Sequence, residues 1–380
     1  MAISTFFLSF VMGFLRWYLP IRLILMGNAV FAGLCFAIAN IDDVIFSLLG
    51  GILADRKGRK PVIMLSTSFY LLGTVLLFLS FQTQSHALII LLLSTVFLWG
   101  VTGLSSGTNS ALIAESTQEH QYGTAFSTYA MCGHAGTITG SFILALVLEL
   151  YGVSYVCYLI MGTSFIGLLI TFWLHETLMS KKKTALEISS FLDTFKSLKT
   201  MTFIVPVLIF VVLNGISLGT SGHFFSIFMK DGLHIDEPYI GSLYAFIPLI
   251  QLLFQPIAGI ITDKKGYFLP LFLGNCIAGI FLFLFAFRSH MFIALSGLLI
   301  FYGLGPFHNV GYQSMIAKLS SHESRATTYS ALLSVWNLMF VIGPLLGGLL
   351  YGVNSVLPFI FSGILLLMII IPLFQLHREK

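Results

Sequence analysis

Gly51-Ile52-Leu53-Ala54-Asp55-Arg56-Lys57-Gly58-Arg59-Lys60 is a strongly basic stretch between two long apolar runs of the chain. A shorter copy, Gly259-Ile260-Ile261-Thr262-Asp263-Lys264-Lys265-Gly266, begins 208 residues later and again lies between two apolar runs. Each stretch combines a glycine, a carboxylate and a basic cluster at the end of an apolar run. Two such stretches in matching places predict a membrane protein that is built from two related halves.

The composition predicts that lipid surrounds most of the chain. Of its 380 residues, 57% are hydrophobic and only 9% are charged, whereas about a quarter of an ordinary sequence is charged. A transmembrane helix needs about 20 mostly apolar residues, and open sheet edges do not survive in hydrocarbon. We therefore predict an all-α integral membrane protein with twelve transmembrane helices. Their predicted ranges are 5–26, 29–54, 61–80, 87–114, 124–150, 153–174, 203–229, 238–261, 268–287, 291–316, 327–351 and 355–375.

The basic residues are unevenly distributed over the connecting segments. If both termini lie in the cytoplasm, the cytoplasmic segments hold 15 of the 19 lysine and arginine residues. The positive-inside rule then fixes the orientation, and the net charge of +4 needs no nucleic acid to explain it. We predict a multi-pass protein of the cell membrane with both termini in the cytoplasm. We expect it to be a monomer in the lipid bilayer, without a nucleic-acid partner.

The two halves resemble each other beyond the basic stretch. At an offset of 208 residues, identical residues recur at eight positions, which in the first half are Gly33, Ala37, Phe46, Gly51, Ile52, Asp55, Lys57 and Gly58. Three lysines at 181–183 mark the midpoint, and apolar residues follow them at the spacing of an amphipathic interfacial helix. We predict two pseudo-symmetric six-helix bundles, 1–178 and 201–380, joined by a cytoplasmic linker, 179–200. Parallel six-helix repeats occur in known transporters.

The pattern Gly51-x-Leu53-Ala54-Asp55-Arg56-x-Gly58-Arg59-Lys60 resembles the loop signature of the major facilitator superfamily. Every position of the signature is filled, the stretch lies between the second and third predicted helices, and the resemblance in architecture covers essentially the whole chain. It implies two six-helix bundles around a central cavity, with access that alternates between the two sides of the membrane. In the family, the signature arginine pairs with an acidic residue at the end of the fourth helix, and the matching residues here are Arg59 and Glu115.

The basic stretch is a candidate gate on the cytoplasmic side. Gly51 would let a neighbouring helix approach, and Asp55 would accept hydrogen bonds at the positive end of a helix. The resemblance implies that this helix is the eleventh, which starts near Thr327. The alternative is a basic anchor without a gating role. The full set of candidate gate residues is Gly51, Asp55, Arg56, Gly58, Arg59, Glu115, Gly259 and Asp263.

Three charged residues lie near the middle of predicted spans. They are Arg16 in the first span, and Asp42 and Asp43 in the second. A charge at this depth costs on the order of 3 kcal/mol and usually faces a partner or a cavity. Arg16 and Asp42 lie within about 5 Å of the same depth at 1.5 Å per residue, so we expect a bridge from Arg16 to one carboxylate. The other carboxylate would be a candidate proton carrier, and a static ion pair is the alternative.

Neutral polar residues recur on several predicted spans and indicate a polar cavity wall. For each residue alone, hydrogen bonding between helices is an equally good explanation, and for His134 and His308 a structural role is favoured. The spacing of the His and Cys residues predicts no metal, no cofactor is expected, and the absence of a nucleophile–base set argues against an enzyme. The candidate cavity residues are Asn109, His134, Asn214, Gln251, His308, Asn309, Gln313, Trp336 and Asn337.

The pattern as a whole predicts transport of a small organic solute by alternating access, coupled to protons through Asp42 or Asp43. The 37 Phe residues and the few charges in the spans favour efflux of amphiphilic compounds. The alternative is uptake of a polar or anionic metabolite, with Arg16 binding its carboxylate or phosphate. A non-transporting membrane sensor is the alternative of another class.

Overall fold

The computed structural model describes residues 2–83, 85–100, 102–117, 122–177, 204–287, 290–319 and 325–378. In this part of the chain, helices alternate with short turns, and twelve helical segments are long and apolar enough to cross a membrane. Each predicted range overlaps one of these segments, so the prediction of twelve transmembrane helices is confirmed. The chain is therefore a multi-pass membrane protein.

The helices group into two compact units. The first unit comprises the described residues up to 177 together with His234–Phe246, and the second comprises 204–233 and the described residues from Ile247 on. The helix α11 therefore contributes its first part to one unit and its remainder to the other. The predicted linker 179–200 and both predicted bundle boundaries next to it lie outside the described residues.

Among the described residues, the first unit contains seven α-helices, the start of α11 and one π-helical turn. They are α1 (Ala2–Met26), α2 (Ala29–Lys57), α3 (Arg59–Gln82), α4 (Ala87–Thr95), η1 (Val96–Gly100), α5 (Thr102–Glu115), α6 (Tyr122–Tyr151) and α7 (Val153–Phe172), with α11 (Glu237–Lys265). The remaining helices form the second unit. They are α9 (Ile204–Gly222), α10 (Phe225–Asp231), α12 (Phe268–Leu271), η3 (Phe272–Ile277), α13 (Ala278–Phe285), α14 (Met291–Leu319), α15 (Arg325–Val353), α16 (Leu357–Met368) and α17 (Ile370–Arg378).

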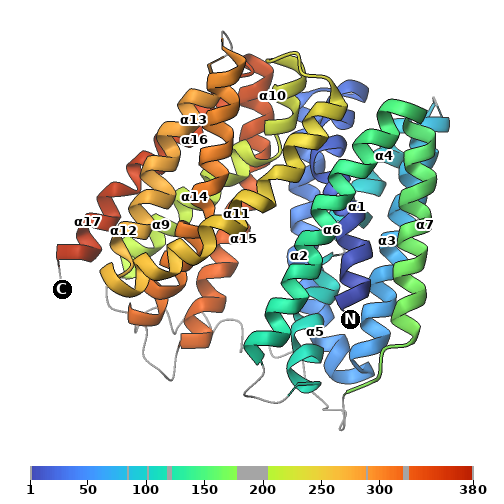
Figure 1. The fold of residues 1–380 in the computed structure, drawn as a ribbon, viewed down its shortest axis with the longest axis horizontal. Coiled ribbons are helices and arrows are strands. Elements are labelled where there is room, and N and C mark those ends of the chain that lie inside the picture. Colours follow the sequence, from blue (N-terminus) through green and yellow to red (C-terminus); the bar gives the residue numbers. More distant parts are fainter. Residues whose placement is uncertain are drawn as a thin grey trace. The chain divides into compact units, whose positions relative to one another are not determined.

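The two units share one pattern of helix packing. In the first unit α1 packs against α6 and α7, and α3 packs against α5 and α7. In the second unit α9 packs against α15 and α16, and α13 packs against α14 and α16. Figure 1 shows α3 and α7 side by side in one unit and α13 and α16 side by side in the other. The first and fifth helices of one half thus correspond to the seventh and eleventh of the whole chain, as a duplication predicts.

The second helix of each half breaks this symmetry. The helix α2 packs closely against α5, because Gly50 lies against the backbone of α5 and Gly103 lies against the backbone of α2. Small residues allow such close approach of helices in membranes. The counterparts in the second half are Ala258 and Pro306, at offsets of 208 and 203 residues. In α2, Gly50 is therefore the glycine that contacts α5. The surroundings of Gly51 lie outside what the structure describes.

Candidate functional site

The turn between α2 and α3 is held by a carboxylate that lies 117 residues further along the chain than Arg59. Gly58 has φ 111° and ψ 161°, a conformation that is essentially restricted to glycine. The backbone N–H groups of Arg59 and Lys60 donate to the two oxygens of Glu176, at 2.9 and 3.1 Å. A Cβ at residue 58 would overlap Glu176. Glu176 therefore caps the N-terminus of α3, where the helix dipole favours a negative charge.

A second carboxylate ties the same turn to the end of α5. Nη2 of Arg59 lies 3.0 Å from Oε1 of Glu115, and Nε of Arg59 also donates to this oxygen, at 3.3 Å. Thr177 donates its hydroxyl proton to the other oxygen of Glu115. Burial raises the pKa of Glu115, but the hydrogen bonds from Arg59 and Thr177 and the Arg59 charge outweigh it, and the net pKa is lowered. We call the residues 58–60, Glu115, Glu176 and Thr177 the loop cluster.

The sequence identified only part of this cluster. The structure brings Arg59 and Glu115 into contact, and Arg56 has an exposed side chain. Glu176 was missed, although its position just after the sixth predicted span places it at the same end of the unit as the basic stretch. The side chains of Asp55 and Thr327, which the gate hypothesis joins, lie outside those described.

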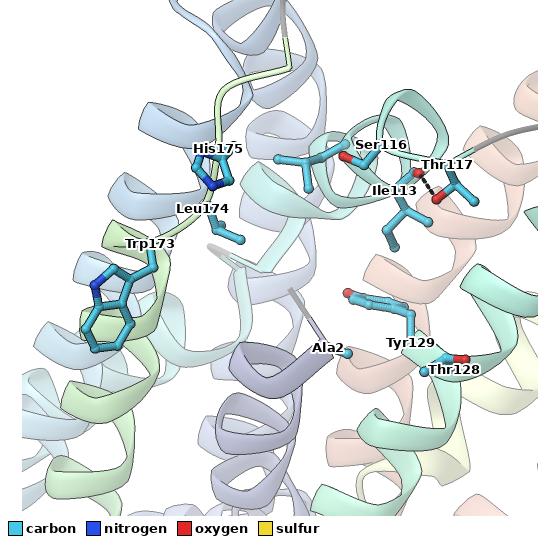
Figure 2. Close-up of a pocket in the computed structure, with 10 residues that line it drawn as sticks. Ala2, Ile113, Ser116, Thr117, Thr128, Tyr129, Trp173, Leu174 and His175 are labelled. Carbon is cyan, nitrogen blue, oxygen red and sulfur yellow. Dashed lines mark hydrogen bonds between the residues drawn. The ribbon is translucent and has the colours of Figure 1, made fainter.

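A pocket of about 510 Å³ opens beside the loop cluster in the first unit. Its wall contains the end of α5, the starts of α1 and α6, and the segment after α7. In Figure 2, Trp173, Leu174 and His175 lie across the pocket from Ser116 and Thr117. The lining is mixed, with apolar side chains and a few hydroxyl and imidazole groups. It consists of Ala2, Leu112, Ile113, Ser116, Thr117, Thr128, Tyr129, Trp173, Leu174 and His175.

A second pocket, of about 230 Å³, lies deeper in the same unit and shares Tyr129 with the first. Nδ2 of Asn109 donates to the Tyr129 hydroxyl at 3.2 Å. The Asn109 Oδ1 is buried and accepts no hydrogen bond from the described residues, so it is available to a donor on a ligand. The lining of this pocket is Thr5, Leu8, Ser9, Met12, Ser66, Thr67, Tyr70, Thr102, Ser105, Asn109 and Tyr129.

Arg16 extends the polar face of this deeper pocket. Ser9, Met12 and Arg16 follow one another at helical spacing on α1, and the first two line the pocket. The Arg16 side chain is exposed, and its charge acts on Tyr70 of α3 and His134 of α6. His134 of α6 is half-buried, and no hydrogen bond or ion pair joins it to Arg16 among the described residues.

The expected bridge from Arg16 to a carboxylate of α2 is not formed among the described residues. Asp43 instead accepts a hydrogen bond from Thr102 of α5 at 3.2 Å and another from the backbone of Gly103. Asp42 is half-buried and has no hydrogen-bond partner among the described residues. The physical reason is packing, because α2 lies chiefly against α5, whereas α1 lies chiefly against α6. A similar depth in the membrane therefore did not bring the two charges together.

The second unit contains a hydrogen-bonded network that joins four helical segments. The Trp336 indole N–H of α15 donates to Oδ1 of Asn214 in α9 at 3.0 Å, and Nδ2 of Asn214 donates to Oδ1 of Asn275 at 2.9 Å. Nδ1 of His308 in α14 lies 3.0 Å from the same Asn275 oxygen. Asn275 lies in the π-helical turn η3 and was not predicted. Such turns often occur at functional sites, but hydropathy does not reveal them.

Three members of this network, Asn214, His308 and Trp336, form one wall of a pocket of about 150 Å³. The rings of Phe210, His308 and Tyr312 are nearly parallel and form a second wall. A Cβ on Gly274 would overlap the backbone of His308, so glycine lets η3 and α14 approach at this point. The lining comprises Phe210, Val211, Asn214, His308, Asn309, Tyr312, Leu333 and Trp336.

The other candidate residues lie outside these three pockets. Gln251 lies beside Gly305 of α14, Gln313 is exposed, and Asn337 is half-buried. A Cβ added to Gly259 would meet no atom of the described residues within 4 Å, so among these residues Gly259 makes no close helix contact of the kind expected for Gly51. Asp263 is exposed. Among the described residues, no three His, Cys, Asp or Glu side chains cluster as metal ligands would.

The sequence and the structure both match known transporters. The chain resembles Multidrug resistance protein MdtG of Salmonella dublin and of Salmonella typhi, with 26% identity over 266 residues. These matches cover 68% of this chain and 63% of each relative, so they span less than two thirds of the relatives' length.

Solved structures with the same fold cover nearly the whole chain. A D-xylose-proton symporter matches with a TM-score of 0.77 and 14% identity, covering 98% of this chain and 95% of its own. The nucleoside transporter NupG matches with a TM-score of 0.76 and 18% identity, covering 99% and 97%. At these identities the likeness concerns the fold alone. The model of the Major Facilitator Superfamily matches residues 1–220 and 207–380, and the chain therefore belongs to this family.

Proposed function

We propose that this protein moves a small organic solute across the cell membrane by alternating access. The observation that carries the proposal is a polar pocket within each of two pseudo-symmetric units of a chain that belongs to the Major Facilitator Superfamily. Solute would contact Asn109 and Arg16 in the first unit, and Asn214 and His308 in the second. No catalytic step is required, so binding and conformational change account for the whole activity.

The loop cluster supports a role in holding the first unit rigid during this cycle. Its contacts join α3, α5 and the segment after α7, all within one unit. A unit whose helix ends are tied together in this way can move as one body. Asp55 would then supply the contact to the other half that closes the cytoplasmic side, with both termini in the cytoplasm.

The relatives support export rather than import. The proteins matched by sequence are named for multidrug resistance, and the pocket linings here combine aromatic, apolar and neutral polar side chains. Such linings suit amphiphilic solutes. We therefore infer efflux of amphiphilic compounds, with the protein working as a monomer.

Transport by the purified protein in liposomes tests this function. Ethidium accumulation would be compared between wild type, Asn214→Leu and the control Ser296→Ala, whose exposed hydroxyl bonds only within its own helix. We expect the wild type and the control to transport, and Asn214→Leu to lose most of the rate. If a panel of amphiphilic dyes and labelled metabolites is moved no faster than through empty liposomes, the proposal is wrong.

Asp42 is the better candidate for proton coupling of the two carboxylates. Asp43 is engaged by Thr102 and Gly103, whereas Asp42 lacks a partner among the described residues. An unpaired carboxylate at membrane depth favours its neutral form and can exchange a proton. We expect Asp42→Asn to abolish the stimulation of transport by a pH gradient and Asp43→Asn to retain it. If the pH gradient stimulates transport equally in wild type and in both variants, these carboxylates are not the proton carriers.

One observation favours a second candidate, uptake of an anionic metabolite. The exposed Arg16 guanidinium extends the face that lines the deeper pocket, where it could bind a carboxylate or phosphate. Under this alternative, Arg16→Glu would abolish movement of anionic solutes and spare neutral ones. Under efflux of amphiphilic compounds, the same variant would retain transport of cationic dyes.

A further inference from the structure

The hydrogen-bonded network in the second unit ends on one side at a group that can only donate and on the other side at a group that can only accept. The Trp336 indole nitrogen can only donate a hydrogen bond, and it donates to Oδ1 of Asn214. At the other end, Nδ2 of Asn275 donates to the backbone carbonyl of Leu271 at 2.7 Å, and a carbonyl can only accept. If the side-chain amide of Asn214 or Asn275 were rotated by 180°, two donors or two acceptors would face each other. Both asparagine side chains therefore have one allowed orientation.

This orientation determines which nitrogen of His308 carries the proton. The Asn275 Oδ1 is an acceptor, so Nδ1 of His308, at 3.0 Å, must donate to it. In the neutral imidazole the other nitrogen, Nε2, is then a bare acceptor. No described residue donates a hydrogen bond to Nε2. His308 lines the pocket, so the unused acceptor belongs to a side chain that a ligand can reach.

The surroundings favour the neutral form of His308. Among the described residues that line the pocket there is no carboxylate to balance an imidazolium. An unpaired charge at membrane depth costs several kcal/mol. His308 therefore acts on a ligand as a hydrogen-bond acceptor and not as a cation.

The size and shape of the pocket point to a single ring system. Its volume of about 150 Å³ equals that of an engineered protein cavity that admits benzene. The Phe210 and His308 ring centroids are 5.9 Å apart, and those of His308 and Tyr312 are 5.8 Å apart. A ring inserted between two others needs about 7 Å, which is two contacts of about 3.5 Å. A ligand ring therefore packs beside this aromatic wall, against Val211 and Leu333.

We propose that this pocket binds an aromatic or heteroaromatic ring that carries an N–H or O–H donor at its edge, and that the donor bonds to Nε2 of His308. The ring is either the whole solute or one end of a larger amphiphile. Asn275 does not line the pocket and acts as a positioning residue that fixes the tautomer. This proposal names a substrate class for the transport function proposed above. Binding of the ring does not depend on that function, but its movement across the membrane does.

Two isomeric probes separate the donor from all other properties of the ring. The molecule 2-methylbenzimidazole has a ring N–H, whereas 1-methylbenzimidazole has the same composition without the donor. Binding of each to the purified protein in nanodiscs is measured by ligand-observed NMR at mildly alkaline pH, where both are neutral. We expect the N–H isomer to bind about tenfold more tightly, which corresponds to about 1.4 kcal/mol and to one hydrogen bond in a buried site.

Three variants locate the source of this preference. His308→Phe keeps a ring in place and should bring the ratio of the two affinities close to one. Asn275→Leu should lower the ratio without touching the ligand, because the imidazole tautomer is then no longer fixed. Trp336→Phe should weaken both isomers alike and leave the ratio unchanged, because the Leu271 carbonyl still orients Asn275. Equal binding of the isomers to wild type, an unchanged ratio in His308→Phe, or no binding of either isomer would overturn the proposal.

The tautomer can be observed independently of any ligand. In protein labelled with ¹⁵N-histidine, the His308 resonances are identified by their loss in the His308→Phe variant. We expect the shift of a bare nitrogen for Nε2 and of a protonated nitrogen for Nδ1, and the reverse pattern would overturn the proposal. A protein that shows the isomer preference but moves no solute in liposomes would refute the transport function alone. One that transports solute without the preference would refute the site alone.

Discussion

The turn after α2 and the turn after α11 are counterparts in the two halves, and they are held by different chemistry. Both contain a glycine with positive φ, 111° at Gly58 and 75° at Gly266. In the first unit the next residue, Arg59, pairs with Glu115. At the matching offsets of 208 and 203 residues, the second unit has Tyr267 and Lys318. There the Lys318 ammonium lies over the Tyr267 ring, 5.9 Å from its centroid.

The links to the last helix of each half differ in the same way. In the first unit the Lys60 ammonium donates to the backbone carbonyl of Phe172 at the end of α7. In the second unit the Tyr267 hydroxyl donates to the backbone carbonyl of Leu376 in α17 at 3.0 Å, and Phe268 packs on His377 with centroids 4.5 Å apart. The duplicated backbone thus joins the same helix ends in both halves. The contacts have diverged from an ion pair in the first turn to aromatic contacts in the second, so salt and acid should act mainly on the first turn.

Replacing the two glycines gives the largest expected effect. Gly58→Ala should lower the free energy of unfolding by about 3 kcal/mol, because φ and ψ at this residue are essentially restricted to glycine and a Cβ would displace Glu176. Gly266→Ala should cost only about 1 kcal/mol, the usual penalty for a left-handed residue. Unfolding in a graded detergent series measures both. Equal losses would contradict the difference between the turns.

Double-mutant cycles compare the ion pair with the cation–π contact. The coupling of Arg59→Gln with Glu115→Gln should be about 1 kcal/mol, since the two side chains are 12% and 33% exposed and exposed pairs contribute at most about this much. The coupling of Tyr267→Leu with Lys318→Met should be about 0.5 kcal/mol. High salt should reduce the first coupling markedly. A larger coupling in the second unit would reverse the comparison.

The features that the sequence predicted depend on short patterns along the chain. Twelve apolar runs defined the helices, and the motif at 51–60 led to the contact between Arg59 and Glu115. The helices were predicted from hydropathy, and the contact was implied by the resemblance of the motif to the family signature. Both predictions survive small errors in where a helix ends. The repeat of Gly58 at Gly266 is visible in the sequence, but the positive φ at both residues was not predicted.

What the sequence did not predict depends on how each helix is rotated. Asn275 reaches His308 from the π-helical turn η3, and no periodicity in the sequence marks such a turn. Asp43 faces Thr102 rather than Arg16 because glycines let α2 approach α5. Glu176 comes from a segment 117 residues away from Arg59 in sequence. Long-range packing decides these contacts, and one sequence without relatives does not record it.

Removing the Tyr267 hydroxyl tests whether the aromatic turn depends on one polar contact. Tyr267→Phe keeps the ring and removes the buried hydrogen bond to Leu376, which should lower the free energy of unfolding by about 1 kcal/mol. Tyr239→Phe is the matched control, because that side chain is 63% exposed, and it should have no measurable effect. If both substitutions cost the same, packing of the ring alone holds the second turn.

Acid should weaken the first turn and spare the second, and this is the smallest expected effect. The pKa of Glu115 is lowered below its ordinary value of 4.5, so its carboxylate stabilises the folded state fully above 4.5 and loses this contribution as the pH falls through the lowered value. The difference in unfolding free energy between wild type and Glu115→Gln should therefore be constant from neutral pH down to 4.5 and shrink below it. Burial raises the pKa of Tyr267, so its hydroxyl keeps its proton throughout, and the Tyr267→Phe difference should not change over the same range. If the difference in unfolding free energy between wild type and Glu115→Gln already shrinks near neutral pH, Arg59 is not the partner of Glu115 in the membrane-embedded protein.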